Sequence, residues 1–82
     1  MHQVENICIE NGILSLVVDG TRIERRLEDV SSLLAAAKPE ELKNFEVSPS
    51  GYGIHWPLID EDVSIDGLLG IQHIPDSNRK SA

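Results

Sequence analysis

One imidazole and three carboxylates lie close together in the second half of the chain. His55 is followed, after a short and largely apolar stretch, by the acidic run Asp60, Glu61 and Asp62. Imidazole nitrogens and carboxylate oxygens are ligands that Zn²⁺ and Mn²⁺ accept in proteins. Because neighbouring residues of a strand point to opposite faces, Asp60 and Asp62 can share a site from which Glu61 is directed away. One interpretation is therefore a metal or small-ligand site made of His55, Asp60 and Asp62.

The same stretch supports a second interpretation, a protein-binding loop. It holds the only tyrosine and the only tryptophan, Tyr52 and Trp56, and aromatic side chains are preferred anchors at protein interfaces. No second histidine supports a metal site, because His2 and His73 fall in segments that we expect to be frayed. We therefore favour partner binding, with no metal or cofactor. The predicted contact residues are Tyr52, His55, Trp56, Asp60 and Asp62.

A structural role explains these residues with fewer assumptions. Trp56 would bury its ring with the N–H bonded at the rim of the core, and His55 would hydrogen bond to a carboxylate. Asp60 or Asp62 would cap a local turn through backbone N–H groups. The sequence alone leaves the structural and functional readings open.

No residue pattern predicts an enzyme. Cys8 lies in a predicted strand, where a buried thiol is inert unless folding brings His55 beside it. The serines of this half have no nucleophile-elbow context, and the pair Gly51 and Gly53 lacks the lysine and following helix of a phosphate loop. We expect a non-catalytic protein.

The charge balance points to a basic protein partner. Fourteen acidic and seven basic side chains give a formal net charge of -7. This field repels nucleic acid phosphates and favours encounters with positively charged proteins. Arg22, Arg25 and Arg26 cluster on one predicted strand and offer the only alternative phosphate contact. Direct nucleic acid binding is therefore not expected.

The expected compartment is the cytoplasm. Cys8 is the only cysteine, so it has no partner for an internal disulfide, and no charged-then-apolar leader opens the chain. No apolar run approaches the ~20 residues that cross a bilayer. We expect no membrane association.

The first third of the chain predicts a three-stranded meander. Strands are expected over residues 4–9, 13–18 and 21–27, with turns at Glu10-Asn11-Gly12 and at Asp19-Gly20. The Asp-Gly pair is typical of a type I′ hairpin turn, in which both central residues have positive φ. Alternation predicts one packed and one solvent-facing surface. Arg25 interrupts the packed face, so we expect it near the sheet edge with its head in solvent.

Two short helices are expected next. Val30, Leu33, Leu34 and Ala37 have the spacing of one helical face, with Asp29 as the expected N-cap and an end by Lys38. Pro39 suits the first position of a second helix that runs through Asn44.

Extended segments return in the second half. We expect strands over residues 45–48 and 53–56, paired around Pro49-Ser50-Gly51, then over 62–65, and a capped turn over 66–69. Residues 1–70 are expected to form a single domain and residues 71–82 a flexible tail. The predicted fold is α+β, a small antiparallel sheet of the N-terminal meander and C-terminal extended segments, with two short helices packed on one face.

The stretch from Gly51 to Leu69 resembles the signature of the bacterial family called domain of unknown function 2442. The shared string is Gly-Tyr-Gly-Ile-His-Trp-Pro, a two-residue gap, Asp-Glu-Asp, Ser-Ile and Gly-Leu-Leu, and the likeness extends over nearly residues 4 to 70. The resemblance implies a small α+β domain with no established enzymatic activity. Some relatives are encoded beside another small protein family, which implies an antitoxin-like or regulatory partner of a small basic protein.

Overall fold

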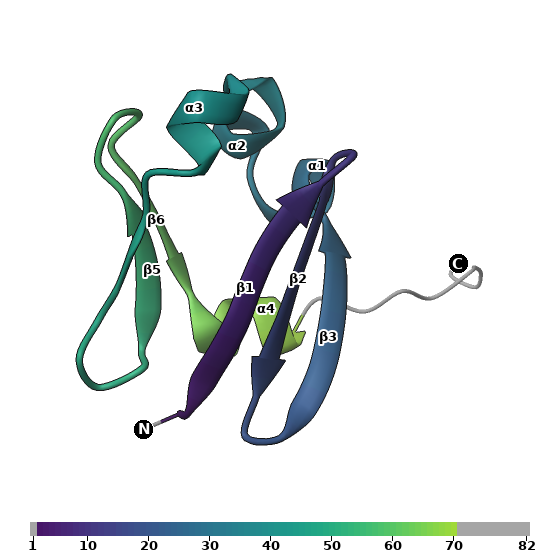
Figure 1. Ribbon diagram of the computed structural model, residues 1–82, viewed down its shortest axis with the longest axis vertical. Helices are drawn as coiled ribbons and strands as arrows, with labels where there is room; N and C mark the ends of the chain where they lie inside the picture. Colours follow the sequence, from purple (N-terminus) through teal and green to yellow (C-terminus); the bar gives the residue numbers. More distant parts are fainter. Residues whose placement is uncertain (1, 71–82) are drawn as a thin grey trace.

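The computed structural model describes residues 2–70, which form two three-stranded antiparallel sheets and four short helices. The strand orders are β1-β2-β3 and β4-β5-β6. Helices α1, α2 and α3 lie at one end of the sheets and α4 at the other (Figure 1). The predicted α+β class is confirmed, and the predicted tail over 71–82 and His73 lie outside the described residues.

The first sheet is the predicted meander. It consists of β1 (Val4–Glu10), β2 (Ile13–Val18) and β3 (Thr21–Arg26). Asn11 and Gly12 have φ of 52° and 76°, and Asp19 and Gly20 have 51° and 85°. Both turns thus have the double positive φ of a type I′ hairpin, whose twist matches that of the strands.

One face of this sheet is packed and the other faces solvent, as predicted. On the central strand Leu14, Leu16 and Val18 are buried. Arg22 and Glu24 of β3 lie on the opposite, exposed face. Strand periodicity therefore places the core on one side of the meander.

The predicted helix between Asp29 and Lys38 is broken in two. The structure has α1 (Leu27–Val30) and α2 (Ser32–Ala36), separated by Ser31 in an extended conformation with φ -166° and ψ 128°. The Ser31 hydroxyl accepts a bond from the Leu34 N–H, so Ser31 caps α2. Asp29 is not an N-cap, because it lies inside α1; its carboxylate accepts from Arg26 Nε at 3.0 Å.

Two further details of this region differ from the prediction. Leu27 is a buried residue of α1 and not the end of a strand. Leu33 was expected on the packed face but is 52% exposed, because the break at Ser31 rotates α2 relative to a continuous helix. The predicted helix from Pro39 is shorter than expected, α3 (Pro39–Leu42).

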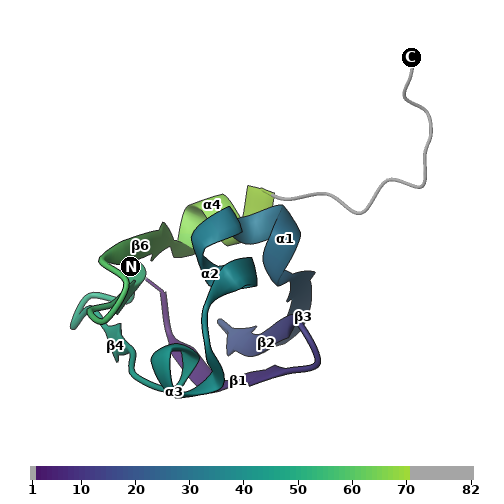
Figure 2. The same cartoon turned by 90° about the horizontal axis from the view of Figure 1, so that it is seen from above.

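The C-terminal extended segments form a sheet of their own. It contains β4 (Glu46–Val47), β5 (Gly53–Trp56) and β6 (Glu61–Ser64), and α4 (Ile65–Gly70) follows directly. The predicted pairing of β4 with β5 is confirmed. Seen from above, the two sheets lie on opposite sides of the interior, with α1 and α4 along one flank (Figure 2).

One hydrophobic core joins the two sheets. Its largest fully buried side chain is Trp56 of β5, and Ile65 and Leu68 bring α4 into the same cluster. Each sheet therefore buries its hydrophobic face against the elements of the other half of the domain.

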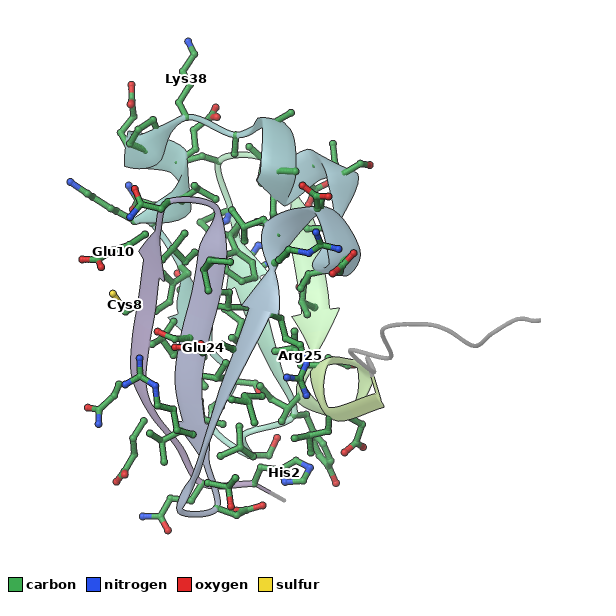
Figure 3. All side chains as sticks on the ribbon, turned by 90° about the vertical axis from the view of Figure 1, so that its right-hand side faces the viewer. His2, Cys8, Glu10, Glu24, Arg25 and Lys38 are labelled. Atoms are coloured by element: carbon green, nitrogen blue, oxygen red, sulfur yellow. The ribbon has the colours of Figure 1, made fainter. Side chains whose placement is uncertain are left out.

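Arg25 differs from its prediction. It lies on the edge strand β3, as expected, but its head is only partly in solvent. Its Nε donates to the Leu68 carbonyl at 2.9 Å, and the side chain lies beside α4 (Figure 3). The guanidinium therefore satisfies a carbonyl at the end of α4, where a positive charge is also favoured.

Candidate interaction surface

The outer face of the second sheet carries a row of three ionisable side chains. Glu46 of β4 lies opposite His55 of β5, which lies opposite Asp62 of β6. His55 Nδ1 and Asp62 Oδ1 are 2.8 Å apart. Because directly opposed residues share a face, all three side chains project away from the core. The predicted hydrogen bond between His55 and a carboxylate is confirmed.

Tyr52 stands at the rim of this row on an ordered loop. The Ser48 hydroxyl accepts from the N–H groups of Tyr52 and Gly53 at 2.9 and 3.1 Å. Gly51 has φ 73°, and a Cβ there would be 1.9 Å from the His2 carbonyl oxygen. The loop therefore requires glycine at that position, and it holds a tyrosine that is 61% exposed.

A shallow hollow of about 480 Å³ lies among these residues. It is bordered by Glu46, His55 and Asp62, with Tyr52 and Pro49 beside them. Gly53 also borders the hollow, and a Cβ at this position would lie 3.0 Å from the Val63 carbonyl oxygen. We call Glu46, Tyr52, His55 and Asp62 the acidic face.

The acidic face belongs to a region without lysine or arginine. Residues 44–70 contain five carboxylates and neither basic residue, so His55 is the only side chain there that can become positively charged. Within residues 2–70, Glu46 and Asp60 form no ion pair. Asp62 lies 2.8 Å from His55 and Asp66 lies 2.8 Å from His2, so among these described residues the carboxylates without an ion-pair partner include Glu46 and Asp60 but not all five.

Trp56 does not belong to this surface. Its side chain is 0% exposed, and its indole N–H donates to the Leu42 carbonyl at 3.1 Å. The Phe45 ring lies 6.1 Å away at an interplanar angle of 50°. A side chain without accessible area cannot contact a partner, so the predicted anchor role of Trp56 is wrong and its structural interpretation is confirmed.

The candidate metal ligands do not converge. Asp60 sits in the turn between β5 and β6 with φ 53°, away from the paired residues His55 and Asp62. Among residues 2–70, no group of three or more His, Cys, Asp and Glu side chains is arranged to hold a metal ion. The expected capping role falls to other residues, since Glu61 accepts from the Asp62 N–H and Ser64 from the Gly67 N–H.

The three arginines of β3 are each engaged within the chain. Arg22 pairs with Glu24 at 3.1 Å and Arg26 with Asp29 at 3.0 Å, while Arg25 binds the Leu68 carbonyl from the other face. They do not form one basic patch.

His2 was missed by sequence reasoning, which placed it in a frayed segment. Its Nδ1 lies 2.7 Å from Asp19 and its Nε2 2.8 Å from Asp66, so it connects the β2–β3 turn to α4. The hydrogen bonds from Asp19 and then Asp66 raise the pKa of His2 above its ordinary value. The pKa of Asp19 is lowered, first by the Gln3 backbone N–H and then by His2. No local pattern links residues so far apart in the sequence.

Comparison with known protein families gives one finding. The family described as "Protein of unknown function (DUF2442)" matches residues 4–73. The chain belongs to this family. Comparison with curated proteins and with solved structures found no match. Membership in DUF2442 confirms the resemblance of the stretch from Gly51 to Leu69, and the family description assigns no function to that stretch. None of the helices within residues 2–70 has the length and apolar character needed to cross a membrane.

Proposed function

We propose that this DUF2442 domain is a non-catalytic interaction module that binds a basic protein through the acidic face. The observation that carries the proposal is the combination of exposed carboxylates with an exposed tyrosine beside one face of a sheet. Glu46 and Asp62 project beside Tyr52, and the surrounding segment holds no lysine or arginine. Surfaces of this charge select positively charged partners and raise their association rate.

Tyr52 is the proposed anchor. The Ser48 hydroxyl fixes the backbone of Tyr52 and Gly53, so little backbone entropy is lost when Tyr52 is covered. A tyrosine face flanked by carboxylates suits the side chains of lysine and arginine, which combine an apolar stem with a positive head.

The biological role follows from the partner. The proposal includes a regulatory or antitoxin-like role toward a small basic protein, as the family resemblance implies. The compartment proposed is the cytoplasm, where the exposed and unpaired Cys8 would stay reduced.

A photo-crosslinking experiment in native cells tests the proposal. Benzoylphenylalanine at position 52 should capture one basic protein in stoichiometric amount, whereas the same group at exposed Glu24 of β3 should not. Once that protein is purified, Glu46→Gln with Asp62→Asn should weaken binding, and added salt should reduce the difference.

The matched control is Glu24→Gln with Glu28→Gln, which removes the same charge from the first sheet and α1. Equal effects of the two double variants would show that only net charge matters. Capture of no protein at position 52, or of an acidic one, would refute the proposed acidic-face function.

A further inference from the structure

A second surface lies at the edge of the first sheet and is independent of the acidic face. In the order β1-β2-β3, strand β1 is an edge, and its other side borders a groove of about 490 Å³. The facing wall of the groove is built by Pro39 and Leu42 of α3, by Lys43 and by Phe45. Figure 2 shows α3 beside β1. The edge therefore borders an opening whose wall is apolar except for Lys43.

The backbone of β1 offers hydrogen-bonding groups to this groove. Glu10 and Ile13 flank the two-residue turn and pair with each other. Cys8 pairs with Ser15, two residues further from the turn along each strand. In an antiparallel ladder such pairs alternate with pairs whose N–H and C=O groups point away. The alternation turns the backbone groups of Ile9 outward. Within residues 2–70, no backbone hydrogen bond from a loop or turn reaches Ile9. The register shifts between Glu5 and Cys8, where Asn6 and Ile7 together oppose Leu16, so Ile7 lies at a bulge outside the regular ladder.

The side chains around the groove specify what an added strand should look like. Ile7 and Ile9 are partly buried on the core side, together with Leu42 and Phe45. Cys8 and Glu10 project to the opposite, outer side (Figure 3), as does exposed Glu5. In an added strand, every second side chain would face inward and should be apolar. The side chains between them would face outward, where they would lie next to carboxylates.

We propose that the β1 edge binds an extended segment of a partner protein in which basic and apolar residues alternate. The backbone of Ile9 would supply the main-chain bonds, and the groove and Glu10 would read alternate side chains. A second copy of this chain fits worse, because its own β1 presents Glu5 and Glu10 where lysine or arginine is complementary and adds a further charge of -7. The inference stands without the acidic face, which lies on the other sheet.

Amide exchange measured by NMR on the whole chain tests this inference. The probe is a short peptide, blocked at both ends, in which lysine and valine alternate. At saturation it should slow exchange of the Ile9 amide by roughly tenfold or more, and of the Cys8 and Glu10 amides, already in the ladder, much less. Two control peptides should leave the exchange of all three amides unchanged. One has the same residues in two separate blocks, and the other has glutamate in place of lysine.

Two variants sharpen the test. Ile9→Pro removes an outward N–H that the sheet itself does not use, and should abolish peptide binding. If that variant does not fold, Glu5→Lys with Glu10→Lys serves instead, since both side chains are exposed; it should reverse the preference toward the glutamate peptide. Each carboxylate removed should weaken the lysine peptide roughly twofold to fivefold.

Three results would overturn the inference. Equal protection by the block peptide would show that the alternation of residues is not recognised. Unchanged exchange at Ile9 would show that no strand is added to β1. A dimer in light scattering that protects the Ile9 amide without peptide would assign the edge to a second copy. Peptide shifts confined to Tyr52 and His55 would refute edge binding while leaving the acidic-face function standing, so the two proposals fail separately.

Discussion

Replacing Trp56 by phenylalanine tests the structural role that the fold assigns to the most distinctive residue of the chain. The substitution removes the indole N–H that bonds to the Leu42 carbonyl at 3.1 Å, and it shortens a side chain with no exposed area. Leaving that carbonyl without its donor costs about 1 to 2 kcal/mol. The lost ring atoms cost about 1 to 2 kcal/mol more in burial and cavity terms. The expected loss is therefore about 2 to 4 kcal/mol.

That loss is large for a chain of this length, whose total stability should be about 4 to 12 kcal/mol. Urea unfolding followed by far-ultraviolet circular dichroism is the suitable assay, because the variant has no tryptophan fluorescence. The midpoint should fall with little change in the slope. Tyr52→Phe is the control, since that side chain is 61% exposed and should change stability by less than about 0.5 kcal/mol. A Trp56 loss as small as that of Tyr52 would refute the central position of Trp56 in the core.

Three further substitutions test the contacts that join distant segments. Arg25→Met should lower the free energy of unfolding by about 1 to 2 kcal/mol in the same assay, because the Leu68 carbonyl loses its donor; a neutral result would show that water replaces the guanidinium. Gly51→Ala should destabilise by more than about 1 kcal/mol, whereas Gly20→Asn, at a φ that asparagine tolerates, should cost less in thermal melts. His2 has a raised pKa, so its contribution is fully present below its unfolded pKa near 6.5 and is lost as pH rises through its folded pKa. His2→Gln should flatten that part of the stability-pH profile, and an unchanged profile would contradict the bridge.

Local patterns were sufficient to predict most of the strands and turns. The turns at Asn11-Gly12 and Asp19-Gly20 can each be predicted from two residues, because Asn, Asp and Gly tolerate the positive φ that a type I′ turn requires. The helical spacing found Leu34, which is buried, but it also implied a continuous helix. The break at Ser31 depends on a hydrogen bond from its hydroxyl to Glu61, thirty residues later in the chain. No window of a helix-length sequence contains that partner.

The candidate site shows the same limit. Alternation along β5 and β6 suffices to put His55 and Asp62 on one face once their strands are paired, and their bond is confirmed. Sequence reasoning overlooked Glu46, whose place in the row depends on the register of β4 with β5. It overvalued Trp56, because the residues next to a tryptophan in the sequence do not show whether its ring lies in a core or at an interface. Only its position relative to Leu42 and Phe45 separates the two.

The N-terminal segment helps to hold the loop that presents Tyr52. The His2 carbonyl packs against Gly51, the residue before the exposed Tyr52, while the His2 ring bonds to Asp66 of α4. The Tyr52 carbonyl in turn accepts the Ile65 N–H at the start of α4, at 2.7 Å. The loop that presents Tyr52 is therefore held both by the segment that leads into β1 and by α4.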